Sequence, residues 1–369
     1  MQKHFGALEL RKCISYNNIV IDYLYLDKRE QVQMCKIHVK HNIPYEAICF
    51  IRKRLFGHKQ WMFPNQIAEI ERLNAQLPED FDDDCIDMSA LCLIISAFTD
   101  NCLNTLDDLI AVFSDAEQLD SIVRTRIESE FTASYTFPVL DQLKNGMAEQ
   151  YVKKLSILKR IGLEEQYNER ILPLVLREKQ KIEQEIAAFD TRSLFNNISK
   201  LKNEQRISDA SVFVSFFSAP VAFTLYGGSF LTCFGSSGSV DFYSLIAHEK
   251  MHGFADHELI ELYEDYISKN PFLCETHRSL IRDYQSGDEE EFVNAAEYYL
   301  CLRAGRATKE ELLKKAKKRY DGVCPVSVIL FDLLSREKEI PRDYNGWLKK
   351  QFTDGNLPVN HVKEYVSAL

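Results

Sequence analysis

The stretch ASVFVSFFSAPVAFTLYGGSFLTCF, residues 210–234, carries no charged side chain and is long enough for a helix across a bilayer. Its composition favours strands instead. Pro220 and the pair Gly227-Gly228 interrupt it, and the segments between them are rich in Val, Phe, Thr and Tyr, which is typical of short strands joined by turns. The stretch therefore predicts a strand-rich block and no membrane-spanning helix.

The chain before this block has a different pattern. Residues 1–200 show apolar positions at helical spacing, with one strand-like piece at 18–26. The strongest helical segments are 88–98, 106–123 and 171–189. Because the pattern changes near residue 205, we expect two domains, a mainly helical one over 1–200 without an assigned role and a second one over 201–369. The expected fold class is α+β, mostly helical, with a small mixed sheet.

Composition excludes several functional classes. The 369 residues are 46% hydrophobic and 27% charged, as in globular proteins, and the formal net charge is -10. That balance argues against a general binder of nucleic acid or of anionic membranes, which depends on clustered Lys and Arg. The ten cysteines include no CxxC pair, and the opening MQKHFGALELRKC has no apolar core of a signal peptide. We therefore expect reduced thiols and a cytoplasmic location.

Helical segments follow the strand-rich block, and the first contains LIAHEKMHGF, residues 245–254. On a helix, His248 and His252 lie one turn apart on the same face, so both rings can point at one ion. Zinc accepts neutral imidazole, and a catalytic zinc site has three protein ligands and a water. Glu249 follows the first histidine and can accept the proton of that water as general base. The spacing therefore indicates a site for one zinc ion.

An HExxH pattern also arises by chance, in roughly one chain in a hundred of this size. The surroundings favour a functional helix, because Ser239 or Asp241 can cap it and several apolar side chains can bury it. Lys250 counts against the interpretation, since stricter forms of the motif leave that position uncharged.

The third ligand is expected in SGDEEEFVNAAEYYLCLRAG, residues 286–305, which opens with a capping-box spacing. Glu290 shares one helical face with Asn294 and Glu297, and either neighbour could orient its carboxylate. Glu290 is therefore our choice of ligand, with Glu297 and Glu291 as alternatives. At least two of the three successive glutamates must instead be solvated side chains at the helix N-terminus, where the helix dipole favours negative charge.

HEKMHGF (248–254) followed by EEFVNAAEYYL (290–300) resembles the zincin superfamily of metallopeptidases, in its glutamate-ligand (gluzincin) branch. The chain is most similar to a poorly characterised bacterial group assigned to the metallopeptidases. In that group a small and an aromatic residue follow HExxH, and about forty residues later comes a helix with Glu, Val, Ala and Glu in that order. The residues that match it here are Glu290, Val293, Ala295 and Glu297.

The resemblance covers about residues 205–352. It implies a zincin-like domain in which His248, His252 and Glu290 hold Zn²⁺ and Glu249 is the general base. In the zincin architecture a peptide adds to an edge strand beside this helix, and the runs 221–225 and 229–234 are candidates for that strand. Hydrolysis also needs a donor to the tetrahedral oxyanion, for which Tyr320 is our candidate.

The leading hypothesis is a cytoplasmic zinc metallopeptidase that hydrolyses peptide bonds in peptide or protein substrates. The alternative is a helical interaction or regulatory protein that keeps a structural or vestigial zincin-like zinc site. Hydrolysis of a non-peptide amide is a third hypothesis, because the same zinc-water chemistry can cleave a peptide bond and another amide bond. Glu249 favours an enzyme, since a structural zinc site has no use for it.

Overall fold

The computed structural model of the chain describes residues 36–53, 62–81, 88–98, 103–127, 130–204, 209–218, 222–284 and 286–369. Residues 35–369 form one compact unit. The strand expected at 18–26 lies outside the described residues.

The described chain is mostly helical, as the sequence predicts. The helical segments before residue 205 are α1 (Ile43–Lys53), α2 (Pro64–Asn74), α3 (Met88–Phe98), α4 (Leu106–Ser114), α5 (Ala116–Arg126), α6 (Glu130–Gln142), η2 (Leu143–Met147), α7 (Ala148–Arg160), α8 (Leu163–Gln166), η3 (Tyr167–Ile171), α9 (Leu172–Ala187) and α10 (Thr191–Leu201). Those after it are η4 (Tyr226–Gly228), α11 (Phe242–Met251), α12 (His257–Ser268), α13 (Pro271–Tyr284), α14 (Glu290–Arg303), α15 (Lys309–Ala316), η5 (Arg319–Gly322), α16 (Pro325–Leu334), α17 (Tyr344–Thr353) and α18 (Val362–Ala368).

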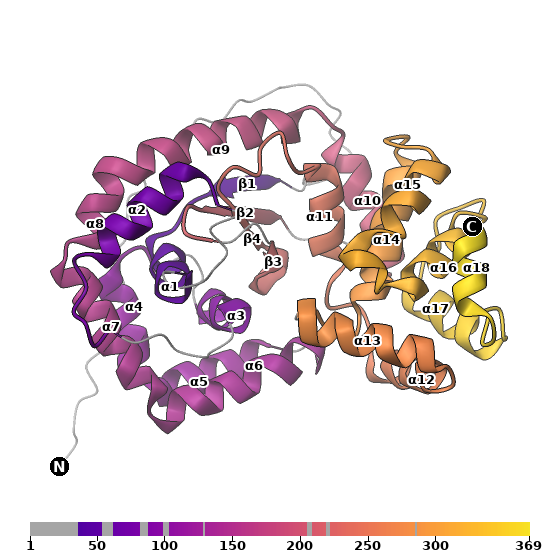
Figure 1. The fold of residues 1–369 in the computed structure, drawn as a ribbon, viewed down its shortest axis with the longest axis horizontal. Helices are drawn as coiled ribbons and strands as arrows, with labels where there is room; N and C mark the ends of the chain where they lie inside the picture. Colours follow the sequence, from indigo (N-terminus) through magenta and orange to yellow (C-terminus); the bar gives the residue numbers. More distant parts are fainter. Residues whose placement is uncertain are drawn as a thin grey trace, which may run out of the picture. The chain divides into compact units, whose positions relative to one another are not determined.

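One small mixed sheet accompanies the helices (Figure 1). Its strands are β1 (Ile37–Lys40), β2 (Ala210–Ser215), β3 (Phe223–Thr224) and β4 (Phe230–Cys233), in the spatial order β1-β2-β4-β3. β1 and β4 run parallel to β2, whereas β3 pairs antiparallel with β4 through the turn η4. The described residues of the uncharged stretch 210–234 thus include three strands, and β3 lies at one edge of the sheet. Among the described residues, no helix has the length and apolar character needed to cross a membrane.

The first half of the chain contributes a strand that the sequence analysis missed. β1 pairs in parallel with β2, with Val39 opposite Val212. Buried apolar side chains from Val39 to Val362 belong to one core cluster. The boundary expected near residue 200 therefore does not separate two compact units in the described chain, because the parallel pairing joins both halves in one sheet.

The three strongest predicted helices form with small differences. α3 matches 88–98, and every side chain from Ala90 to Ala97 is buried. α9 covers most of 171–189. The expected helix 106–123 is two helices, because the Asp115 side chain accepts from the amide of Gln118 at 3.0 Å and starts α5 there.

The sheet and α9 position the segment before α11. α9 packs against β1 and β2, while α1 and α3 lie on the opposite side of the sheet (Figure 1). Two carboxylates of α9 hold the loop that precedes α11: Glu178 accepts from the amide of Ser237 and Glu185 from that of Gly238, both at 2.8 Å. α11 therefore starts from a fixed place beside the sheet.

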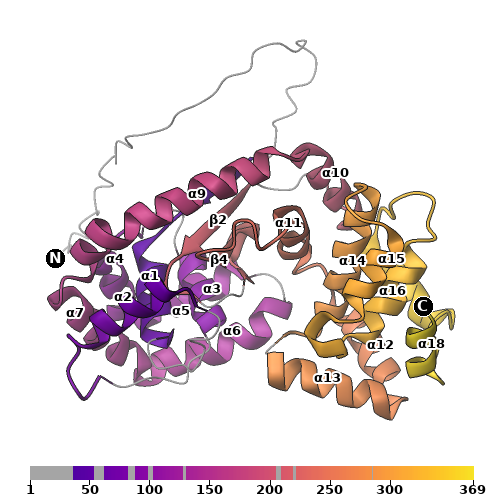
Figure 2. The ribbon, with the colours of Figure 1, turned by 45° about the horizontal axis from the view of Figure 1, so that its top comes forward.

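α14 is the central helix of the second half, and it packs between α11 and α16 in both views (Figures 1 and 2). Because neighbours cover it on more than one side, every side chain from Glu290 to Cys301 is buried. Glu289, which directly precedes α14, is buried like Glu290, Glu291 and Glu297 within it, so each of these four carboxyl groups needs a partner inside the protein.

Candidate metal centre

α11 begins and ends at identifiable residues. Asp241 is its N-cap and accepts from the amide of Tyr243 at 3.1 Å, so of the two predicted caps the structure uses Asp241. The helix ends at Met251, and His252 has extended dihedral angles, with φ -55° and ψ 152°. Gly253 then turns the chain with φ +76°. The second histidine thus follows the helix, whereas the sequence placed it within the helix.

The two histidines nevertheless converge with Glu290. His248 Nε2 lies 3.3 Å from His252 Nε2 and 3.6 Å from Glu290 Oε1, and His252 Nε2 lies 3.9 Å from Glu290 Oε2. One ligand atom from each of the three residues lies within 4.8 Å of the others. His248 and Glu290 are buried and His252 is partly buried. These three residues, the ligand triad, could hold a metal ion.

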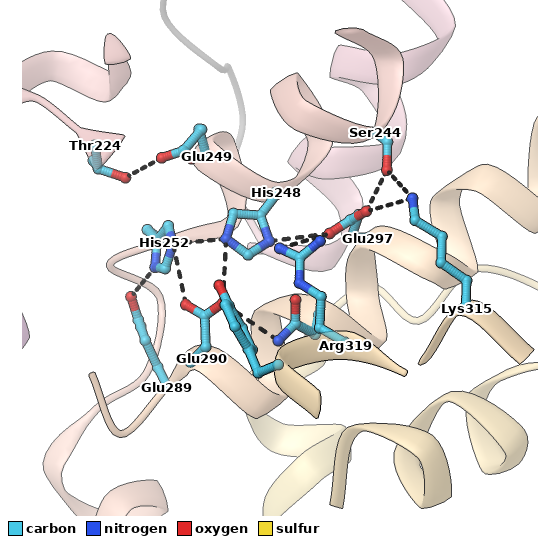
Figure 3. A network of polar contacts seen from close by, with 12 residues as sticks. Thr224, Ser244, His248, Glu249, His252, Glu289, Glu290, Glu297, Lys315 and Arg319 are labelled. Atoms are coloured by element: carbon cyan, nitrogen blue, oxygen red, sulfur yellow. Dashed lines mark hydrogen bonds and ion pairs between the residues drawn. The ribbon is translucent and has the colours of Figure 1, made fainter. Parts of the chain in front are cut away.

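Each imidazole is oriented by a carboxylate from the region of α14 (Figure 3). His248 Nδ1 lies 3.1 Å from Glu297 Oε2, and His252 Nδ1 lies 2.9 Å from Glu289 Oε1. Such a partner fixes which nitrogen carries the proton and leaves Nε2 free as a ligand. Neither role was predictable from the sequence, because a contact between two helices leaves no signal in the spacing along one of them.

Glu297 is itself held by three groups. The Ser244 hydroxyl donates to its Oε1, Lys315 Nζ lies 3.5 Å from the same oxygen, and Arg319 lies 3.8 Å from Oε2. Burial alone would raise the pKa of the Glu297 carboxyl, but Arg319 and His248 outweigh burial and hold the pKa well below its usual range. Glu297 therefore stays ionised beside His248. The shared helical face predicted that Glu297 could orient the Glu290 carboxylate. In the structure it orients His248 instead.

Glu290 has two polar neighbours outside the ligand triad. Asn294 donates to its Oε1 at 3.3 Å, as the shared helical face predicts. The hydroxyl of Tyr320 donates to the same oxygen at 2.8 Å. Burial would raise the pKa of Glu290, but the two histidines and Arg319 lower it below its usual value. The carboxylate is thus ionised, as a metal ligand must be.

Tyr320, our candidate oxyanion donor, therefore lies at the site. Burial and the neighbouring Glu290 raise its pKa, so that its hydroxyl stays protonated and able to donate.

Glu249 is buried beside the ligand triad without belonging to it. Its Oε2 accepts from the hydroxyl of Thr224 at 2.8 Å (Figure 3). Thr224 is on the edge strand β3, so this bond links the carboxylate to the strand beside α11.

Lys250 contacts residues outside the ligand triad. Its ammonium group lies against Gly228 of the β3–β4 turn and 5.8 Å from the centre of the Phe195 ring. The lysine at this position of the motif thus packs against the turn and α10.

Glu291, an alternative ligand in the sequence analysis, has a different place. It is buried and accepts from the Tyr263 hydroxyl at 2.9 Å and from the amide of Ser327 at 2.8 Å. Burial raises its pKa to about 7 against the effect of these donors. Glu291 of α14 therefore links this helix to α12 and α16. It is neither part of the ligand triad nor a solvated side chain.

The donor set of the ligand triad fits zinc. Two imidazoles and one carboxylate are ligands that zinc accepts, and three protein ligands with an open position are typical of catalytic zinc. Within the described ranges no fourth His, Cys, Asp or Glu joins the three. Burial disfavours the charged form of His252, but Glu289, Glu290 and Glu249 raise its pKa to about 9. A cation at this place would replace that proton and meet the same carboxylates.

Comparisons with protein-family models, with curated proteins and with solved structures gave no match.

Proposed function

We propose that this chain is a zinc-dependent metallopeptidase that hydrolyses peptide bonds with water. The observation that carries the proposal is the arrangement of Glu249, which is buried next to the ligand triad, held by Thr224, and absent from the triad itself. A structural or vestigial zinc site, as in a regulatory protein, has no need for a buried carboxylate in that position.

His248, His252 and Glu290 would hold the ion. A bound zinc would supply Lewis acidity, lowering the pKa of a water and polarising the carbonyl of the substrate. Glu249 accepts the proton of the attacking water and passes it to the leaving amine. The Thr224 hydroxyl fixes the direction of the Glu249 carboxylate, and Glu289 and Glu297 keep the two imidazoles in the tautomer that exposes Nε2.

Tyr320 supplies a donor for the tetrahedral oxyanion. Its hydroxyl is held at Glu290 Oε1, at the edge of the ligand triad, and it remains protonated at neutral pH. In this proposal it exchanges Glu290 for the oxygen of the substrate carbonyl as negative charge develops there.

The edge strand β3 is the proposed docking site for the peptide main chain. It pairs with β4 on one side, is adjacent to α11, and carries the threonine that contacts Glu249. An extended peptide that adds to this edge would bring its scissile bond near Glu249. A cytoplasmic location fits the free thiols of Cys49, Cys92, Cys233, Cys274, Cys301 and Cys324 in the described chain.

The decisive experiment combines metal analysis with hydrolysis of a mixed peptide library. We expect one zinc per chain in the wild type and loss of that zinc in His248→Ala and His252→Ala. Glu249→Gln should keep the zinc and lose hydrolysis by on the order of 10²- to 10⁴-fold, which is the usual contribution of a general base. Zinc without hydrolysis in the wild type would favour the structural alternative, and zinc retained after both histidines are replaced would place the metal elsewhere.

A further inference from the structure

The short turn η5, which carries Tyr320, has a backbone conformation that residues other than glycine rarely adopt. Tyr320 (φ 47°, ψ 48°) and Asp321 (φ 53°, ψ 26°) are consecutive residues in the left-handed region. This conformation is unfavourable for residues with a Cβ, and a bulky tyrosine is especially rare there. Such a conformation persists only where the surroundings impose it.

The last residue of α13 makes two contacts that can impose it. The hydroxyl of Tyr284 donates to Asp321 Oδ2 at 2.6 Å, and the ring of Tyr284 lies against that of Tyr320 with their centres 4.9 Å apart. On the other side, Arg319 lies 3.8 Å from Glu297, which orients His248. Both ends of the turn are thus tied to elements outside it.

We propose that Tyr284 is a positioning residue that holds η5, through Asp321, in the left-handed conformation that places the Tyr320 hydroxyl at Glu290. Without this bond the turn relaxes toward right-handed dihedral angles, and the Tyr320 hydroxyl leaves the ligand oxygen. The inference rests on the proposed function only for its effect on hydrolysis. Its effects on the turn and on the Glu290 carboxylate apply whether or not the protein is a peptidase.

The test is a double-mutant cycle with Tyr284→Phe and Tyr320→Phe in the full chain. Zinc affinity is measured by competition with a chromophoric chelator. Loss of a hydrogen-bond partner of a ligand weakens metal binding by roughly 10- to 100-fold, and we expect this for Tyr320→Phe. Tyr284→Phe should weaken it in the same direction, and the double variant should bind no more weakly than Tyr320→Phe alone. Effects that multiply in the double variant would overturn the proposal, because Tyr284 would then act independently of Tyr320.

Two variants of Asp321 separate positioning from general destabilisation. Asp321→Asn keeps an acceptor for Tyr284 and a residue that tolerates left-handed angles, so it should behave as wild type. Asp321→Ala loses both and should resemble Tyr284→Phe. Tyr266→Phe is the matched control, because it removes a hydroxyl that donates to the Pro358 carbonyl at 2.7 Å, away from the turn.

Amide hydrogen exchange gives a readout that needs neither metal nor substrate. The amide of Val323 donates to the Tyr320 carbonyl at 3.1 Å, and its exchange should accelerate in Tyr284→Phe and not in Tyr266→Phe. Unchanged exchange at residues 319–323 would overturn the inference even if peptide hydrolysis is found. Accelerated exchange with the expected cycle, in a protein that hydrolyses no peptide, would support it while the proposed function fails.

Discussion

Glu289 Oε1 lies 2.9 Å from His252 Nδ1 and also accepts from the amide of Gly253 at 2.8 Å. This carboxylate therefore fixes both the ring of the second histidine and the turn that ends α11. Because His252 lies beyond the helix, helical geometry alone does not direct its ring, and Glu289 performs that function from the start of α14.

We expect Glu289→Ala to weaken zinc binding by roughly 10- to 100-fold, as for other partners of ligand histidines. Glu289→Gln keeps one acceptor oxygen and should have a smaller effect. Affinity is measured by chelator competition, with the exposed Glu264 of α12 replaced by alanine as the control. Equal affinities of Glu289→Ala and wild type would show that the Glu289 carboxylate is not needed to orient the ring.

The sequence predicted the ligand triad because its signals are local. Two histidines four apart, and a glutamate that shares a helical face with Asn294, are patterns within short stretches of the sequence. The contacts of Glu289, Thr224 and Arg319 were not predictable, because each joins segments far apart in the chain and depends on how the helices pack.

The fold was predictable to a similar extent. Helical periodicity and the Pro and Gly interruptions predicted the class and the strands of 210–234. β1 was missed because four residues of strand, IHVK, show no distinctive alternation, and their partner lies about 170 positions away. Because β1 was missed, nothing in the sequence indicated that the first half of the chain contributes a strand to the sheet, and the division near residue 200 stays a prediction.

The adjacent glutamates 290 and 291 should have opposite phenotypes. Glu290→Gln should weaken zinc binding while leaving the fold intact, because the neutral amide is a poor ligand. Glu291→Gln should keep zinc and lower the free energy of unfolding by about 1–3 kcal/mol, since its amide cannot accept from both Tyr263 and Ser327 as the carboxylate does.

Zinc content and urea denaturation of the metal-free proteins measure the two effects. If Glu291→Gln loses zinc at full stability, the third ligand has been assigned to the wrong neighbour.

The buried side chain of Glu46 should make the free energy of unfolding depend on pH. Glu46 accepts from the Ser215 hydroxyl and the Phe216 amide, both at 2.8 Å. Burial raises its pKa from 4.5 to about 7 against these donors. Because the folded state binds this proton more tightly than the unfolded state, the stability it contributes is full below pH 4.5 and is lost as the pH rises through about 7.

Urea denaturation of wild type and Glu46→Gln at several pH values between 4 and 8 tests this. The variant lacks the titrating group, so its free energy of unfolding should change less over that range, whatever its absolute stability. Parallel curves for the two proteins would show that Glu46 has the same pKa in both states.

The bond between Thr224 and Glu249 gives the most specific prediction about catalysis. The Thr224 hydroxyl donates to Glu249 Oε2 at 2.8 Å and so directs the carboxylate that the proposed mechanism uses as general base. Thr224→Val keeps the β-branched shape that suits a strand and removes only the hydroxyl. We expect kcat on a cleaved library peptide to fall roughly 10-fold, a typical effect of losing an orienting contact.

Zinc content and KM should stay unchanged, because neither the ligand triad nor the main chain of β3 is altered. Thr224→Ser restores a hydroxyl and should recover most of kcat, which separates a role for the hydrogen bond from a role for side-chain volume. In the Glu249→Gln background, Thr224→Val should have no further effect on the residual rate, since the group that it directs is already absent. If Thr224→Val lowers kcat equally in both backgrounds, the threonine acts through the strand and not through Glu249.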